Sequence, residues 1–265
     1  MTSKISRYAR LRELISELTQ EAAAGLPDRK ARAALREARQ ASDEVDRLVQ
    51  QLDPITRPQH VFYPSDPRIT GLFVAMALVA QETLALGSLK VFYGSGVYAL
   101  YYRGDFSPYG PICRTEHPIY IGKADPKDPQ AGLPWDQGDK LFGRLKEHRS
   151  SIAKAKNLRV DDFRCRHLVV QSGFQNAAEG YLRSFFNPLW NGLGIGKHGD
   201  FASTRQNKKS VWDTLHPGRT WAGPSPEGKS EAEILSNVEA HFIAHHIYRS
   251  VNEIVDQFYL QLKQK

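Results

Sequence analysis

Three short β-rich runs, separated by helical patterns, constrain the fold of this chain more than any other feature. The runs are 96–102, 118–122 and 163–170, and they are rich in the aromatic and β-branched residues typical of strands. Helical periodicity covers 139–157, between the second and third runs, and 175–186, after the third. This order predicts an α+β fold, with a small antiparallel sheet of about three strands flanked by helices.

Further helical patterns lie at both ends of the chain. Residues 4–52 carry Leu11, Leu14, Ile15 and Leu18 at helical spacing and are interrupted at 25–27. We expect four segments: a helical hairpin at 1–60, a proline-rich linker and packing helix at 61–93 (helix at 71–87), a core at 94–192, and a basic loop region with one long helix (231–262) at 193–265.

Basic residues outnumber acidic ones, 36 to 29, for a net charge of +7. Much of this excess lies in 144–166, where eight basic residues stand against three acidic ones. Such clustering favours a polyanionic partner over a solvated helix face. The only two cysteines, Cys113 and Cys165, exclude a disulfide framework and a four-cysteine zinc site.

No segment suggests a membrane or an export signal. The longest apolar run, 72–80, is far shorter than the roughly 20 residues of a membrane-spanning helix. The N-terminus opens with a charged helical pattern and lacks an apolar signal-peptide core. The sequence therefore predicts a cytoplasmic protein with reduced thiols and no membrane partner.

Six scattered residues form the most specific pattern. Gly-Val-Tyr on the first run and Tyr-Ile-Gly on the second are followed by Arg-x-x-x-His, a helical Glu and an Asn. The residues concerned are Tyr98, Tyr120, Arg144, His148, Glu179 and Asn191. In this order the chain resembles the GIY-YIG nuclease superfamily over 94–192, with Val97 in place of the usual Ile. Taken singly, each residue would be an ordinary core tyrosine or a surface side chain.

The resemblance extends to a subgroup of this superfamily. The two motif tyrosines are 22 residues apart, which is longer than a tight hairpin and resembles the spacing in type II restriction endonucleases. The segments 188–191 and 212–219 also resemble those of restriction enzymes that cut the palindrome CCGCGG.

The resemblance implies a role for each of the six residues. Tyr98 would deprotonate the attacking water with help from His148, because an unperturbed phenol titrates near 10. Tyr120 would position the water or the phosphate, and Asn191 would orient the site. Arg144 lies one helical turn from His148 and would stabilise phosphate charge in the transition state.

A metal ion is implied by the same resemblance. Glu179 would supply the carboxylate oxygen that binds one Mg²⁺, or Mn²⁺, per active site. One carboxylate is enough where water and phosphate oxygens complete the coordination of the ion.

Double-stranded DNA is the implied partner. Besides the basic cluster, the expected DNA-contacting residues are Lys123, Arg103, Arg114, Arg205, Lys208, Lys209 and Arg219. A palindromic target requires a symmetric homodimer, or a tetramer of two dimers. A restriction enzyme also implies a cognate DNA methyltransferase.

The sequence thus predicts a Mg²⁺-dependent type II restriction endonuclease that hydrolyses phosphodiester bonds at a short palindrome, with CCGCGG as the candidate. Two alternatives stay open: a homing or repair endonuclease of the same superfamily, and a non-catalytic DNA-binding protein on the same fold. No zinc finger or separate DNA-binding module is visible, which favours the restriction enzyme over the first alternative.

Overall fold

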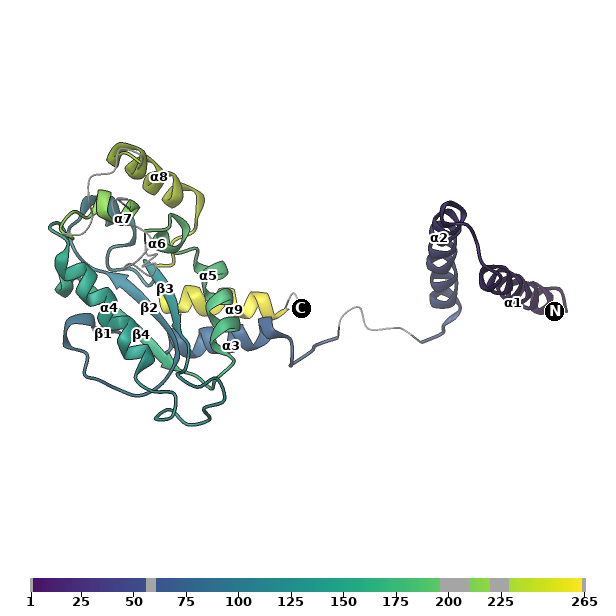
Figure 1. Ribbon diagram of the computed structural model, residues 1–265, viewed down its shortest axis with the longest axis horizontal. Coiled ribbons are helices and arrows are strands. Elements are labelled where there is room, and N and C mark those ends of the chain that lie inside the picture. Colours follow the sequence, from purple (N-terminus) through teal and green to yellow (C-terminus); the bar gives the residue numbers. More distant parts are fainter. Residues whose placement is uncertain (1, 56–60, 196–209, 220–228, 264–265) are drawn as a thin grey trace. The chain divides into compact units, whose positions relative to one another are not determined.

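The chain forms two compact units, Met1–His60 and Val61–Lys265. A computed structural model (Figure 1) describes residues 2–55, 61–195, 210–219 and 229–263. In the first unit, α1 (Thr2–Ala23) and α2 (Asp28–Leu52) are joined by a turn. Gly25 in this turn has φ of +90°, a conformation that favours glycine. Within the described residues, no helix is both long enough and apolar enough to span a bilayer.

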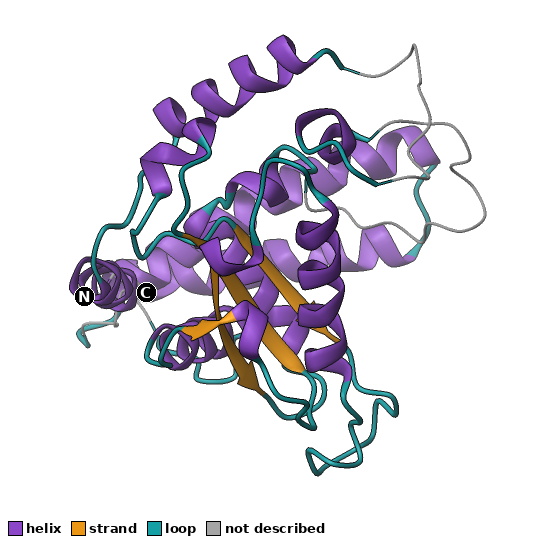
Figure 2. Cartoon of the chain, turned by 90° about the vertical axis from the view of Figure 1, so that its left-hand side faces the viewer, coloured by secondary structure: helices purple, strands orange, loops and turns teal. Residues whose placement is uncertain are grey.

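The second unit is built on a four-stranded antiparallel sheet (Figure 2). Its strands, in the order β1-β4-β2-β3, are β1 (Leu84–Ala85), β4 (Phe163–Val169), β2 (Gly96–Tyr102) and β3 (Tyr120–Ala124). The helices are α3 (Pro67–Val79), α4 (Lys140–Lys154), α5 (Gln175–Phe186), α6 (Leu189–Gly192), α7 (Val211–Leu215), α8 (Glu231–Ala244) and α9 (Val251–Lys263). The expected α+β class is confirmed, with one short strand more than the three expected.

The extra strand lies where the sequence predicts a helix, because 71–87 is not helical throughout. Helix α3 ends at Val79, and the next residues run along the edge of β4. Arg164 on β4 donates to the Thr83 carbonyl at 2.5 Å, and Arg166 donates to the Gln81 carbonyl at 2.7 Å. These bonds hold the segment in an extended conformation, so long-range contacts override its apolar helical pattern.

Alternation along the central strand β2 divides the core into two layers. Val97, Ala99 and Tyr101 face a layer formed with α3, α5 and α9. Tyr98, Leu100 and Tyr102 lie on the opposite face and belong to the layer that includes α4, α6, α7 and α8. All seven β2 residues are buried, as expected for a strand covered on both faces.

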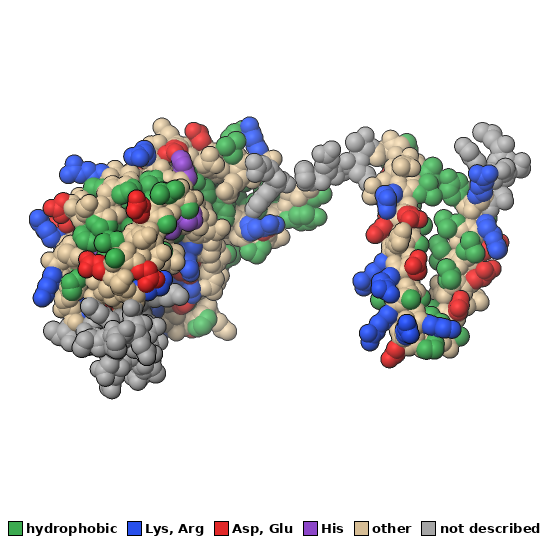
Figure 3. All heavy atoms as spheres, turned by 90° about the horizontal axis from the view of Figure 1, so that it is seen from above, with side chains coloured by type: hydrophobic (Ala, Val, Ile, Leu, Met, Phe, Trp, Pro, Cys, Tyr) green, Lys and Arg blue, Asp and Glu red, His purple; other side chains and the backbone are tan. Residues whose placement is uncertain are grey.

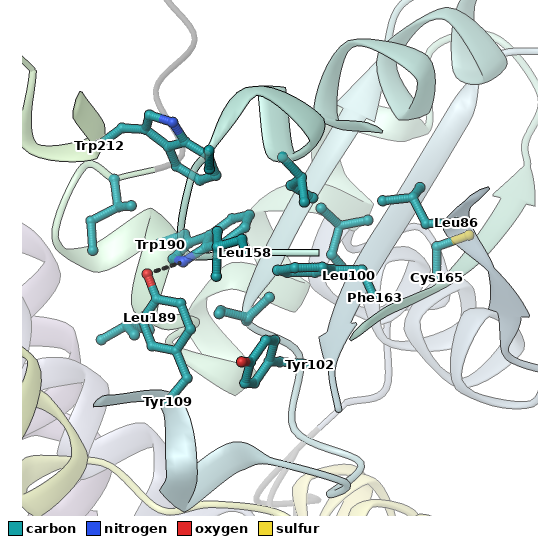
Figure 4. Packing of buried hydrophobic residues seen from close by; sticks show 14 of the residues in the cluster. Leu86, Leu100, Tyr102, Tyr109, Leu158, Phe163, Cys165, Leu189, Trp190 and Trp212 are labelled. Carbon is teal, nitrogen blue, oxygen red and sulfur yellow. Dashed lines mark hydrogen bonds between the residues drawn. The ribbon is translucent and has the colours of Figure 1, made fainter. Parts of the chain in front are cut away.

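The long connection between β2 and β3 is anchored in the second layer. It forms a short 3-10 helix (Ser107–Ile112) whose Tyr109 is fully buried beside Trp190 (Figure 4). The Tyr109 hydroxyl accepts from Trp190 Nε1 at 3.0 Å and lies 2.6 Å from His216 Nε2. His216 Nδ1 in turn lies 2.9 Å from the Asn157 amide oxygen. This chain of polar contacts joins segments that are far apart in sequence and satisfies groups that would be costly to bury alone.

The C-terminal region contains two helices instead of the single long helix expected at 231–262. Helix α8 ends at Ala244, and α9 begins at Val251. The Ser250 hydroxyl accepts from the Glu253 amide at 3.2 Å, while the Glu253 carboxylate accepts from the Arg249 amide at 2.7 Å. This arrangement is typical of a new helix start and explains why the helical pattern does not continue.

Candidate active site

The pair of Tyr98 and His148 forms the buried centre of the site. Tyr98 projects from β2 toward α4, where His148 lies on the buried side of the helix, and each residue is only 2% exposed. The Tyr98 hydroxyl lies 2.8 Å from His148 Nε2. Because a phenol donates its proton when it is neutral, this contact assigns the acceptor role to Nε2.

Tyr120 lies against this pair at the start of β3. Its ring centroid is 6.0 Å from that of Tyr98 and 4.7 Å from that of His148. Gly122 is the register partner of Tyr98 across the two strands. A Cβ atom at Gly122 would approach the Tyr98 hydroxyl to 2.5 Å, so only glycine fits without moving the tyrosine. Close packing against Tyr98 therefore explains the glycine of the Tyr-Ile-Gly motif.

The environment keeps both tyrosines protonated. Burial raises the pKa of Tyr98 well above its ordinary value, and interaction with Tyr120 adds to this, while the charge of Arg144 opposes it. Burial also raises the pKa of Tyr120, with a further contribution from the negative charge of Glu179. Tyr98 is therefore a neutral hydrogen-bond donor in the protein alone and not a phenolate.

Arg144 lies one turn before His148 on α4, at the edge of an open pocket. Its guanidinium is half exposed and donates from Nη1 to the Glu147 carboxylate at 2.9 Å. The pocket lies between the end of β3 and the start of α4 and is also lined by Lys127 and Lys140. The arrangement leaves a solvent-accessible cation next to the buried tyrosine and histidine.

Glu179 reaches the site from α5. Its side chain is 19% exposed and lies 3.8 Å from the guanidinium of Arg183, one turn later on the same helix. Burial raises the pKa of the Glu179 carboxyl, while the charges of Arg183 and Lys123 oppose the rise. Helix α5 packs against β3, and the negative charge of Glu179 contributes to the raised pKa of Tyr120 on that strand.

Lys123 follows the Tyr-Ile-Gly motif on β3 and is paired with a carboxylate. Its Nζ lies 2.6 Å from the Asp125 oxygens, and Gln175 donates to the same carboxylate at 3.2 Å. The ion pair and the hydrogen bond lower the pKa of Asp125, although burial opposes them. The six-residue motif does not include Asp125, Gln175 or Arg183, which sequence reasoning missed. Their only sequence signal is their spacing from the motif residues; Arg183, for example, follows Glu179 by one helical turn.

Asn191 binds the edge of β3 through its side chain. The amide oxygen accepts from the Ile121 backbone N–H at 2.9 Å, and the amide nitrogen donates to the Ile121 carbonyl at 2.8 Å. These two bonds satisfy backbone groups on the side of β3 that has no neighbouring strand. Asn191 thus holds the strand that carries Tyr120 and Gly122.

The expected DNA-contacting arginines differ in their positions. Arg103 and Arg114 are exposed on the connection between β2 and β3. Arg219, in contrast, is buried: its side chain is 3% exposed and its Nε donates to Asp213 at 2.6 Å. Its expected role in reading DNA is not compatible with this position, because the guanidinium faces the interior. Three other candidates lie outside the described residues: Arg205, Lys208 and Lys209.

The donor atoms around Glu179 determine which kind of divalent-cation site these residues can form. Within the described residues, no group of three His, Cys, Asp or Glu side chains could hold a metal ion. The partly exposed Glu179 carboxylate is a hard oxygen donor of the kind Mg²⁺ prefers, and Mg²⁺ commonly keeps several waters. The residues therefore fit a hydrated ion held by one carboxylate, and they do not fit an ion enclosed by protein ligands.

Comparison with known proteins agrees with this arrangement. No curated protein matches the chain. Residues 90–242 match the family model described as the Eco29kI GIY-YIG domain. The match covers more than half of the 265 residues and contains all six residues of the motif. The chain therefore belongs to the Eco29kI GIY-YIG domain family of restriction endonucleases, and its core is a nuclease domain.

Proposed function

We propose that this protein is a Mg²⁺-dependent type II restriction endonuclease, which cuts both strands of a short palindrome in double-stranded DNA. The observation that carries the proposal is the buried contact of 2.8 Å between Tyr98 and His148, with Tyr120 packed against both. Three separate elements bring these rings together, and a fourth supplies Glu179.

Tyr98 and His148 act as a relay for the proton of the attacking water. Because the phenol is neutral, it accepts the water proton at its oxygen only as its own proton passes to His148 Nε2. The resulting hydroxide attacks phosphorus, the bond to the 3′ oxygen breaks, and the histidine becomes an imidazolium. Tyr120 positions the water or the phosphate beside this pair.

Arg144 and Glu179 act on the charges of the phosphate. The Arg144 guanidinium exchanges part of its contact with Glu147 for phosphate oxygens and stabilises the charge that grows in the transition state. Glu179 would hold the metal ion through its carboxylate. When bound, Mg²⁺ would supply positive charge that offsets the negative charge of the phosphate and of the leaving group.

The candidate target is CCGCGG, on the basis of the family relationship. The proposed base-reading residues are the exposed Arg103 and Arg114, together with Arg205, Lys208 and Lys209, and Lys123 would contact phosphate. A homodimer, or a tetramer of two dimers, would match the two-fold symmetry of a palindrome and provide one active site for each strand. The proposal implies a cytoplasmic enzyme whose host DNA is protected by a cognate methyltransferase.

Digestion of a plasmid of known sequence tests the proposal. We expect discrete fragments with Mg²⁺ and none with a chelator, and sequencing of the fragment ends gives the site and the cut position. If no fragments form with any divalent metal, the result would support a non-catalytic DNA-binding protein. Nicking that depends on DNA structure would support a repair enzyme.

The variant Glu179→Ala tests the metal-ligand role. We expect cleavage to fall by at least about 1,000-fold, because charge stabilisation by a metal contributes several kcal/mol to catalysis. DNA binding, measured by fluorescence anisotropy without metal, should stay within about threefold of the parent protein. Unchanged cleavage by this variant would remove Glu179 from the mechanism.

A further inference from the structure

The N-terminal hairpin lacks the contacts that a stable pair of helices normally makes. Helices α1 and α2 approach each other at too few points to form a packed pair. None of the described side chains from 7 to 55 is buried. Since an amphipathic helix owes most of its stability to packing of its apolar face, these two helices require an additional partner.

The unpacked side of the hairpin is an apolar groove. It has a volume of about 760 Å³ and is lined mainly by leucine and alanine side chains from both helices. Figure 3 shows hydrophobic side chains gathered on the facing sides of the two helices, with charged side chains toward the outside. Leu18 and Leu35 in this groove are 63% and 52% exposed, which is unfavourable for large apolar residues.

Charge along each helix identifies what fills the groove. The first half of each described helix has a net positive charge and the second half a net negative charge. In α1, Arg7, Arg10 and Arg12 precede Glu13, Glu17 and Glu21. In α2, five basic residues against Asp28 and Glu37 are followed by Asp43, Glu44 and Asp46 against Arg47. In α1, whose first turn has no acidic residue, this order opposes the helix dipole. A helix that packs antiparallel to either of these helices, however, places opposite charges side by side.

A second copy of the chain satisfies both requirements. Its hairpin carries the same apolar side chains and the same charge order, and a two-fold axis perpendicular to the helices places identical helices antiparallel. We propose that the N-terminal hairpins of two chains associate through their grooves into an antiparallel four-helix bundle. This bundle is a dimerisation module that lies outside the matched nuclease segment 90–242.

Sedimentation equilibrium of the full-length protein without DNA tests the proposal. We expect a concentration-dependent species of twice the 29.9 kDa chain mass. Leu35→Glu should raise the dimer dissociation constant at least about 100-fold, because the dimer buries this side chain twice. The matched control is Leu133→Glu in the second unit, where the leucine is 48% exposed and outside the groove, and its dimer should be unchanged.

A charge variant keeps the test decisive if Leu35→Glu unfolds the hairpin. Asp43, Glu44 and Asp46 are all changed to Lys, which gives both halves of α2 a net positive charge. We expect the parent dimer to tighten when ionic strength falls from about 0.5 to 0.05 M, and the variant dimer to weaken over the same range. A parent protein that stays monomeric at about 100 μM, or a dimer that neither variant weakens, overturns the proposal.

The measurement involves neither DNA nor cleavage. The dimerisation proposal can therefore fail while the nuclease proposal stands, and the reverse also holds. Binding of the hairpin to another protein or to DNA is the interpretation that a strictly monomeric chain would favour.

Discussion

At the scale of single residues, the proposed mechanism assigns a chemical function to the buried hydroxyl of Tyr98. The strand β2 buries three tyrosines, Tyr98, Tyr101 and Tyr102, on its two faces. Only Tyr98 points toward a histidine on α4, and the neutral phenol and Nε2 satisfy each other. Tyr101 lies on the opposite face, where it packs in the layer with α3, α5 and α9. Tyr98 and Tyr101 are therefore a matched pair of buried tyrosines, and of these two only Tyr98 contacts His148.

Removal of the Tyr98 hydroxyl is expected to stop proton transfer from the attacking water. We predict that Tyr98→Phe lowers kcat by about 100- to 10,000-fold, which is the usual contribution of a general base. The measurement is single-turnover cleavage of a DNA duplex that contains the target site. The control Tyr101→Phe also removes a buried hydroxyl from the same strand and should keep kcat within about threefold. Equal loss in both variants would indicate a structural effect only.

The glycine of the second motif is expected to affect activity through Tyr98. We predict that Gly122→Ala displaces the Tyr98 hydroxyl, because the new methyl group would lie 2.5 Å from it. Overpacking of this kind typically costs about 1–3 kcal/mol of unfolding free energy, and cleavage should fall at least about tenfold. Urea unfolding and single-turnover kinetics measure the two effects. Gly110→Ala, where nothing lies within 4 Å of the added atom, is the control and should change neither.

At the scale of elements, helix α5 carries both the proposed metal-binding carboxylate and a cation that affects the charge of this carboxylate. Glu179 and Arg183 lie one turn apart on α5, and their charged groups are 3.8 Å apart. Burial favours the neutral carboxyl and raises the pKa of Glu179, while Arg183 favours the ionised form. This balance sets the pH below which Glu179 becomes protonated and, on the proposed mechanism, would lose its metal ion.

The pH profile of cleavage tests this balance. Because metal binding requires the carboxylate, activity falls as pH is lowered through the raised pKa of Glu179. We predict that Arg183→Ala raises this pKa further and moves the acidic limb of kcat/KM to higher pH. Arg183→Lys retains the positive charge and should leave the limb closer to that of the parent. An acidic limb that moves to lower pH in Arg183→Ala would contradict the assignment.

A second element with a defined electrostatic role is α7. Ser210 and Asp213 form a capping box at its start, and Asp213 also binds the guanidinium of Arg219. The ion pair and the hydrogen bonds lower the pKa of Asp213, although burial opposes them. Because both charges are buried and paired, loss of either partner would leave an uncompensated charge. The segment that includes α7 is therefore stabilised by Arg219.

At the scale of the whole molecule, the proposed dimer would determine how many strands are cut in one encounter. Each proposed active site contains one Tyr98–His148 pair and would hydrolyse one phosphodiester bond. Two linked active sites would act on both strands of a palindrome before the DNA dissociates. On these proposals, the hairpin and the nuclease segment make separable contributions to the same outcome.

Product analysis with a supercoiled plasmid that carries one target site tests this link, which rests on both proposals. We predict that Leu35→Glu accumulates nicked circles at low enzyme concentration, whereas the parent protein forms mainly linear DNA. The number of bonds hydrolysed per chain should change less than about threefold, because the catalytic residues are untouched. Leu133→Glu is the control and should give linear DNA. Mainly linear product from a monomeric Leu35→Glu protein would show that the hairpin is not needed for double-strand cleavage.

Local patterns were sufficient for most of the fold. The β-rich runs at 96–102 and 118–122 correspond to β2 and β3, and the helical run 175–186 corresponds to α5. Hydrophobic residues that repeat every two residues in a strand, or every 3.6 residues in a helix, mark the buried side of that element. These patterns therefore agree with the elements of the folded protein. The family relationship, predicted from two motifs and their spacing, was also confirmed.

The sequence by itself therefore determined the α+β class, the order of its main elements and the six candidate residues of the site. Only the tertiary structure decided that Arg219 is an interior partner of Asp213, that residues 84–85 form an edge strand, and that α1 and α2 leave a groove open. Each of these features depends on groups distant along the chain, or on contacts that fail to form. Local periodicity contains no information about such contacts, because the free energy of burying a charge or pairing a strand edge depends on the neighbours brought there by the fold.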